Sequence, residues 1–135
     1  MKKILLITSI SLIIFSGSSI QANEIDSRQK AYQAEGASDF SASRGEEMWH
    51  KEFPDPKKPG EKRTCGTCHT DNLKNKGKHA RTGKVIDPLS PSVNSERFTD
   101  QKFIEKWFKR NCKWVVGREC TAQEKGDFLE YLRNK

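Results

Sequence analysis

The chain has 135 residues, with 25 lysines and arginines against 18 aspartates and glutamates, and a formal net charge of +7 at pH 7. This length suits one small domain. Apart from a run near the N-terminus, no apolar stretch approaches the roughly 20 residues that cross a bilayer, so the composition excludes a membrane protein with several spans.

The chain begins with the features of a secretory signal peptide, over residues 1–22. Lys2 and Lys3 precede an apolar run at 4–15, and small and polar residues follow up to Ala22. A membrane anchor is the alternative, but the run is too short to span a bilayer comfortably. We expect cleavage after Ala22, export to the periplasm and no membrane span in the mature chain. Loss of the two lysines lowers the net charge to +5.

After the signal peptide the chain divides into two parts. Residues 23–42 are polar with scattered alanines and predict a loose helical lead-in to a domain at 43–135. Ser43 and Glu46 have the spacing of a helix capping box, which predicts a first helix over 45–53. The prolines that follow end this helix and open a polar loop.

The central feature of the chain is the sequence Cys-Gly-Thr-Cys-His at residues 65–69. Positions i and i+3 share one face of a helical turn, so Cys65 and Cys68 present two thiols to the two vinyl groups on one side of a porphyrin. His69 then points its imidazole at the iron. The pattern predicts one covalently attached haem c, with His69 as the proximal iron ligand.

Two other classes of protein use a CxxC pair. A thioredoxin-type redox motif would need a surrounding βαβ pattern, which the sequence lacks. A zinc site would need a second cysteine pair at ligand spacing, and Cys112 and Cys120 are eight residues apart. Haem attachment is therefore the preferred prediction.

The segment after the motif predicts loops. Residues 71–84 are polar with little periodicity, and Pro88 and Pro91 predict an extended, turn-containing loop. We expect the backbone carbonyl of Pro88 to accept a hydrogen bond from the second ring nitrogen of His69, the usual support for a haem histidine. A plain surface loop is the alternative.

A further helix is predicted over residues 100–112, with Thr99 as its N-cap. Its apolar residues share one face: Phe103, Ile104, Trp107 and Phe108. Asn111 lies on that face, and an unpaired buried amide costs on the order of 1–3 kcal/mol, so it needs a partner. That partner is either a helix-end carbonyl or water, or the haem iron.

The two remaining cysteines, Cys112 and Cys120, close a short loop. Export to an oxidising compartment permits a disulfide between them. Such a bridge would stabilise the fold by roughly 2–3 kcal/mol on the chain-entropy model. A reactive pair of free thiols is the alternative that the residues leave open.

The last helix is predicted to begin at Thr121, because Glu124 completes a second capping box. Gly126 in this helix and Gly45 in the first helix are expected to let the two helices cross closely. The buried face of the last helix consists of Phe128, Leu129 and Leu132. Together the helices predict an all-α, small cytochrome c-like fold wrapped around one covalently bound haem.

The sixth iron ligand decides the function. Small electron-carrying cytochromes use a methionine well after the haem motif, but here Met1 leaves with the signal peptide and Met48 precedes the motif. The usual ligand set is therefore absent. The candidates that remain are Asn111, Asn94, His79, His50, a lysine, or no ligand.

Five stretches beside the motif carry a family resemblance. They are His-Ala-Arg-Thr-Gly-Lys at 79–84, Pro-Leu-Ser-Pro-Ser-Val-Asn at 88–94, Arg-Phe-Thr-Asp at 97–100, Lys-Trp-Phe-Lys-Arg-Asn-Cys at 106–112 and Gly-Arg-Glu-Cys-Thr-Ala-Gln-Glu-Lys-Gly-Asp at 117–127. With the CGTCH motif they resemble the SHP (sphaeroides haem protein) family of oxygen-binding monohaem c-type cytochromes. The likeness covers most of residues 43–133.

The resemblance implies a cytochrome c fold in which Asn111 is the sixth ligand and Cys112 forms a disulfide with Cys120. It also implies that O2, NO, CO or other diatomics bind after the asparagine leaves reduced iron, and that the redox partner is a dihaem cytochrome c. The chemistry agrees, because a neutral amide is a weak, hard ligand that competes poorly for Fe(II). The alternative is a simple electron carrier, either with two histidine ligands, His69 and His79, or with an open site.

Basic residues flank the motif on both sides: Lys57, Lys58, Lys62 and Arg63 before it, and Lys74, Lys76, Lys78, Arg81 and Lys84 after it. A positive field near an exposed haem edge would steer an acidic redox partner. A solvated basic surface is the alternative, and nucleic acid is not an expected partner. No acid/base pair in the sequence indicates enzymatic turnover.

Overall fold

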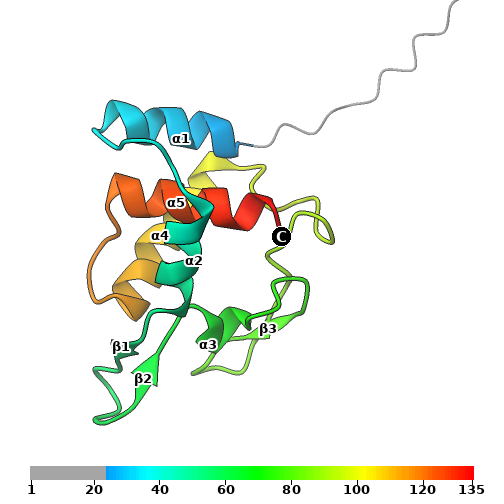
Figure 1. Cartoon of the computed structure of the whole chain (residues 1–135). Coiled ribbons are helices and arrows are strands. Elements are labelled where there is room, and N and C mark those ends of the chain that lie inside the picture. Colours follow the sequence, from blue (N-terminus) through cyan, green and yellow to red (C-terminus); the bar gives the residue numbers. More distant parts are fainter. Residues whose placement is uncertain (1–23) are drawn as a thin grey trace, which may run out of the picture.

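A computed structural model describes residues 24–135 as a mainly helical fold with two short hairpins (Figure 1). The expected signal peptide, residues 1–22, lies outside the described residues. None of the described helices is long and apolar enough to cross a membrane. In chain order the elements are α1 (Ile25–Ala34), α2 (Ala42–His50), β1 (Phe53–Pro54), β2 (Lys62–Arg63), α3 (Gly66–His69), β3 (Gly77–Lys78), β4 (Val85–Ile86), α4 (Gln101–Val115) and α5 (Ala122–Arg133). The all-α prediction is confirmed.

Helices α2 and α5 cross at close range (Figure 1). The crossing depends on Gly45, because a Cβ there would overlap the backbone carbonyl of Asp127 and lie 2.8 Å from the Cβ of Tyr131. The prediction that Gly45 meets Gly126 at this crossing is right for Gly45 and wrong for Gly126. Gly126 instead accommodates the ring of Phe40, which a Cβ would overlap.

Two helices are capped by other residues than those predicted from the sequence. Helix α2 begins earlier than predicted, because the side chain of Ser41, not Ser43, accepts the hydrogen bond from Arg44 N. It also ends at His50, so Phe53 belongs to β1. Helix α4 is capped by Asp100 rather than Thr99: the Asp100 carboxylate accepts from Phe103 N at 3.0 Å.

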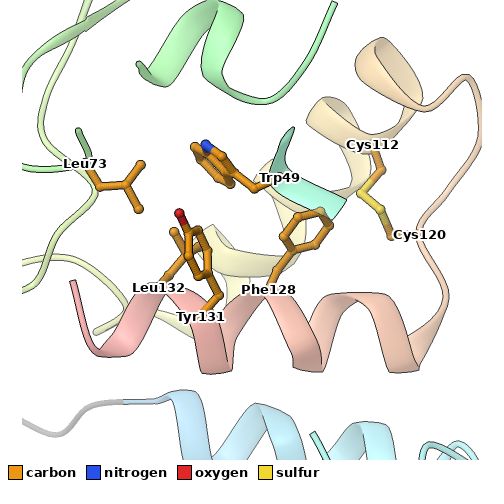
Figure 2. Packing of buried hydrophobic residues seen from close by; sticks show 7 residues of the cluster. All are labelled: Trp49, Leu73, Cys112, Cys120, Phe128, Tyr131 and Leu132. Atoms are coloured by element: carbon orange, nitrogen blue, oxygen red, sulfur yellow. A yellow bond between two sulfur atoms is a disulfide. The ribbon is translucent and has the colours of Figure 1, made fainter. Parts of the chain in front are cut away.

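The main core lies between α2, α4 and α5 (Figure 2). Trp49 of α2 is its centre, with ring centroids 6.4 Å from Phe128 and 6.0 Å from Tyr131 on α5. The other buried members are Leu73, Cys112, Cys120 and Leu132. The capping box of Thr121 and Glu124 starts α5 as predicted, and its apolar face is buried as predicted.

Helix α1 packs on α5 and completes a second core cluster, which differs from the loose lead-in expected from its composition. Ile25 and Tyr32 are fully buried there. The Tyr32 hydroxyl donates to the carboxylate of Glu105 on α4. Arg28 and Lys125 form ion pairs with the same carboxylate at 2.8 Å and 3.0 Å. This charged cluster therefore ties α1, α4 and α5 together.

Two antiparallel hairpins flank the short helix α3, where the sequence predicts polar loops. In the first, β1 pairs with β2 so that Phe53 lies opposite Arg63. In the second, β3 pairs with β4 so that Gly77 lies opposite Ile86. Each ladder is two residues long, which is too short to leave the alternating pattern by which a strand is recognised in a sequence.

Candidate haem site

The CGTCH residues form a single helical turn. Cys65 caps α3, Cys68 lies within it, and His69 is its last residue. Thr70 then takes a positive φ of 65° and turns the chain away. Both cysteines are free, as attachment to a cofactor requires. Cys68 Sγ accepts a hydrogen bond from the backbone N–H of Ala80 at 3.4 Å, so the second hairpin touches this side of the turn.

The protonation states of the motif suit a haem better than thiol exchange. Burial raises the pKa of the Cys65 thiol to about 12. A thioredoxin-type cysteine needs a lowered pKa to act as a thiolate. Burial, with a smaller contribution from the positive charge of Arg97, lowers the pKa of His69 to about 4. The imidazole is therefore neutral at pH 7, which is the form that binds a metal.

The hydrogen bond expected between His69 and Pro88 is not formed. The carbonyl of Pro88 accepts from Asn94 Nδ2 at 3.1 Å and from Arg97 Nε at 2.7 Å. His69 Nδ1 is buried and has no partner among the described residues. Two donors therefore compete for the carbonyl that the sequence assigns to His69, and neither could be recognised from spacing alone.

The apolar face predicted for α4 divides into two. Ile104 is buried in the core, whereas Phe103 and Trp107 remain 45% and 39% exposed, with their rings in edge contact at 5.9 Å. Asn111 follows them at the same interval of four residues, so the three side chains lie in one line along α4. This line is apolar, open, and ends in an amide.

The named candidates for the sixth ligand differ in whether their side chains already have a partner in the protein. Asn94 donates to Pro88, His50 Nδ1 lies 3.5 Å from Asp71, and His79 Nδ1 accepts from Thr82 N at 3.1 Å. The half-buried side chain of Asn111 makes no hydrogen bond within residues 24–135. Among these four side chains, Asn111 is therefore the one without a partner in the described chain.

The structure joins Cys112 to Cys120 in a disulfide, with a Cα–Cα distance of 5.6 Å, as the family resemblance implies (Figure 2). Both cysteines are buried in the main core. The bridge ties the last turns of α4, which carry Asn111, to the residue before the α5 cap. It also leaves Cys65 and Cys68 without the second thiol pair that a zinc site would need.

Arg63 is a buried residue that the sequence does not reveal. Its side chain is 4% exposed, lies 3.3 Å from Asp55, and stacks over the Trp114 ring at 4.4 Å. In the sequence it is one of several cations before the motif, and no periodicity separates it from its exposed neighbours. Its contacts link the first hairpin to α4.

These residues fit a covalently attached haem. Two free thiols and a neutral histidine occupy one turn, and a line of exposed aromatic rings leads to an unpartnered amide. His69 also packs against Trp49, with ring centroids 5.8 Å apart, so its imidazole is held by the core. A haem would fit these residues, with its two vinyl groups for the thiols and its iron for the imidazole.

The comparisons with known proteins agree with this chemistry. A family model described as a domain of unknown function, DUF1924, matches residues 35–132. Cytochrome c'' of Methylophilus methylotrophus is 39% identical over 92 residues, covering 68% of this chain and 62% of the relative. Cytochrome c-type protein SHP of Cereibacter sphaeroides is 49% identical over 69 residues, covering 51% of this chain and 53% of the relative. The chain thus spans less than two thirds of each curated relative's length.

Solved structures match over more of the chain. Oxidized SHP, described as an oxygen-binding cytochrome c, gives a TM-score of 0.72 at 36% identity and covers 82% of this chain and 96% of that chain. Oxidized cytochrome c'' of Methylophilus methylotrophus gives a TM-score of 0.69 at 32% identity and covers 81% and 92%.

The fold, the CGTCH turn and these matches define a c-type cytochrome, a class that carries covalently bound haem c. Within that class the chain belongs to the SHP family, and residues 35–132 are its DUF1924 domain.

Proposed function

We propose that the chain is a periplasmic electron-transfer cytochrome that binds O2, NO or another diatomic once its iron is reduced. Cys65 and Cys68 hold the haem through thioether bonds, and His69 is the proximal ligand. When bound, haem c would supply a one-electron redox couple. The signal-peptide pattern of residues 1–22 supports export to the periplasm.

Asn111 would be the sixth ligand of a bound ferric haem. The observation that carries this assignment is its half-buried amide, which has no partner in the described chain and lies in line with Phe103 and Trp107 on α4. Because the side chain is only half-buried, water can reach the amide, and its oxygen stays available to coordinate an iron.

Asn111 would be released from a reduced iron. An amide oxygen is a hard, neutral ligand that competes less well for Fe(II) than for Fe(III), so reduction would shift a two-state equilibrium toward release. The disulfide at Cys112 limits how far the neighbouring side chain can move. Phe103 and Trp107 then present an apolar surface, which suits a small uncharged ligand.

The relatives support the two halves of this proposal separately. SHP is described as an oxygen-binding cytochrome c. The solution structure of cytochrome c'' is described as giving insight into haem-ligand detachment. The electron donor is an acidic redox protein, and the family resemblance favours a dihaem cytochrome c.

Absorption spectra of the holoprotein in both redox states test the proposal. We expect a six-coordinate ferric haem and a five-coordinate, high-spin ferrous haem that binds CO rapidly. Asn111→Ala should change the ferric spectrum and leave the ferrous spectrum almost unchanged. Asn111→His should keep the ferrous haem six-coordinate and slow CO binding by at least about tenfold, since a histidine holds Fe(II) more tightly than an amide.

His79→Ala is the matched control, because His79 is the ligand of the competing bis-histidine cytochrome. It should leave both spectra unchanged. A low-spin, six-coordinate ferrous haem in the unmodified chain would contradict release of the ligand. A ferric spectrum that changes with His79→Ala and not with Asn111→Ala would assign the plain electron carrier instead.

A further inference from the structure

The structure separates the two groups of basic residues that flank the haem motif. In the first hairpin, residues 51–63, five cations are accompanied by three acids. Each acid pairs with one cation: Lys58 with Glu61 at 3.0 Å, Lys62 with Glu52 at 2.7 Å, and Arg63 with Asp55 at 3.3 Å. Three of the five cations of this hairpin are therefore paired with its own carboxylates, which leaves a net charge of +2.

The second hairpin, residues 72–86, has five cations and no acid, and one exposed acid lies directly outside each end of it, Asp71 and Asp87. Its cations are all exposed: Lys74, Lys76, Lys78, Arg81 and Lys84. None of their side chains has an ion pair or a hydrogen bond within residues 24–135. Val85, 59% exposed, lies among them and adds an apolar point of contact.

The second hairpin also touches the haem-attachment turn. At β3, Gly77 packs so closely on α3 that a Cβ would overlap the carbonyl oxygen of Cys68. At the hairpin loop, the N–H of Ala80 donates to Cys68 Sγ. Figure 1 shows β3 beside α3, with the β1–β2 hairpin on the other side of that helix. The hairpin that carries the unpaired cations therefore contacts Cys68, one of the two cysteines that we propose to hold the haem.

We infer that the second hairpin is the docking surface for an acidic electron-transfer protein, which delivers one electron to the haem at its Cys68 edge. The inference rests on the proposed function for the attachment at Cys68, and it is independent of Asn111. The reduced partner loses one electron, ferric iron gains it and becomes ferrous, and no bond to the partner forms or breaks.

The composition of the surface favours a protein over other polyanions. Unpaired lysines around an exposed valine give a charged rim with a small apolar centre, as in transient protein interfaces. Such a rim mainly raises the association rate, and it does so by long-range attraction that salt screens. The partner should therefore be fast to bind, weakly held and sensitive to ionic strength.

Two double variants of equal charge test the inference. Lys76→Gln with Lys84→Gln removes two cations of the second hairpin. Lys51→Gln with Lys57→Gln removes two cations of the first hairpin, and neither of these forms an ion pair in the described chain. The probe is an acidic flavodoxin in its hydroquinone state, which becomes the semiquinone as the ferric holoprotein is reduced. Stopped-flow absorbance gives the second-order rate constant.

We expect the second-hairpin variant to react about 3- to 10-fold more slowly than the unmodified holoprotein at an ionic strength of about 10 mM, because electrostatic steering is lost. The first-hairpin variant should stay within about twofold. The difference should vanish at about 0.5 M salt. Equal rates for the two variants, or slowing that persists at high salt, would overturn the inference.

Two further measurements separate the alternatives. Sedimentation with phosphatidylglycerol vesicles tests a membrane surface: vesicle binding lost in the second-hairpin variant, with its reduction rate unchanged, would overturn the protein-docking assignment. Spectra of the ferrous variants with and without CO report on Asn111. Ferrous spectra that do not change when CO is added would contradict the proposed release of Asn111. They would not affect the comparison of reduction rates.

Discussion

Asn111 and Arg63 show how differently single side chains near the haem turn are held. Asn111 has no side-chain hydrogen bond within the described residues, and its position is set by the helix and by the disulfide at the next residue. Arg63 is fixed by a carboxylate and an aromatic ring. The Asn111 amide therefore remains available for a partner outside the described residues, and Arg63 is a rigid part of the fold.

Replacement of Asp55 by asparagine should therefore be strongly destabilising. The change leaves the buried guanidinium of Arg63 without its counter-charge, and losing one partner of a buried pair costs about 3–5 kcal/mol. Urea denaturation of the ferric holoprotein, followed by circular dichroism, measures the loss of unfolding free energy. Arg63→Met, which fills similar volume without a charge, should cost less than Asp55→Asn.

Lys62→Gln is the control, because it removes a neighbouring ion pair whose two side chains are 64% and 59% exposed. We expect no measurable change in its denaturation midpoint. If Asp55→Asn and Lys62→Gln lowered the unfolding free energy equally, the buried Arg63–Asp55 pair would be no more important for stability than the exposed Lys62–Glu52 pair.

At the scale of elements, the close packing of β3 on α3 positions the attachment turn. The pairing of β3 with β4 holds Gly77 against the backbone of Cys68, and a Cβ at Gly77 would also lie 3.0 Å from the Cα of His69. The hairpin and the haem turn therefore act as one unit. Sequence patterns could not reveal this, because each strand has only two residues.

Gly77→Ala should displace the haem turn. Both contacts of the new Cβ are backbone atoms, so either β3 or α3 must shift, at a cost of about 1–3 kcal/mol or more. We expect a lower unfolding free energy together with an altered ferric spectrum, because His69 moves with the turn. Lys78→Ala, at the exposed neighbouring position, should alter neither. An unchanged ferric spectrum for Gly77→Ala would contradict the coupling between hairpin and haem turn.

The long helices were the most predictable elements, because their signals are local. The capping box at Thr121 and the buried face of α5 follow from spacing alone. At α4 the periodicity identified the helix but did not show that Ile104 would enter the core while Phe103 and Trp107 stayed exposed. Tertiary packing decides which residues of a broad apolar face are buried in the core. The periodicity of a single sequence does not show this.

The candidate site was predictable to a similar extent. The CGTCH turn and the Cys112–Cys120 pair are recognisable by spacing and by family resemblance, and the role of Asn111 stays a prediction. The partners of Pro88 are not, because Asn94 and Arg97 reach its carbonyl through a folded loop. Nor did the sequence show which flanking lysines are paired with acids, since those pairs depend on the hairpin geometry.

At the scale of the whole molecule, the structure has a charge asymmetry about the haem turn. Three of the five cations of the first hairpin form ion pairs with its own acids, and none of the five in the second hairpin has an ion pair in the described chain. The apolar line on α4 is a separate surface, formed by Phe103 and Trp107 with Asn111. We thus assign electron entry to the second hairpin and gas binding to α4. Substitutions in the hairpin should leave gas binding unchanged, and substitutions on α4 should leave the rate of reduction by the partner unchanged.

The proposed function depends most on Asn111, whose amide would bind the iron of the oxidised holoprotein as the sixth ligand. A crystal structure of the ferric holoprotein tests it most directly, since it shows which side chain lies opposite His69. The account predicts the side-chain oxygen of Asn111, with the Cys112–Cys120 disulfide intact. Another side chain in that position, such as His79 or a lysine, or an iron with no protein ligand there, would contradict it.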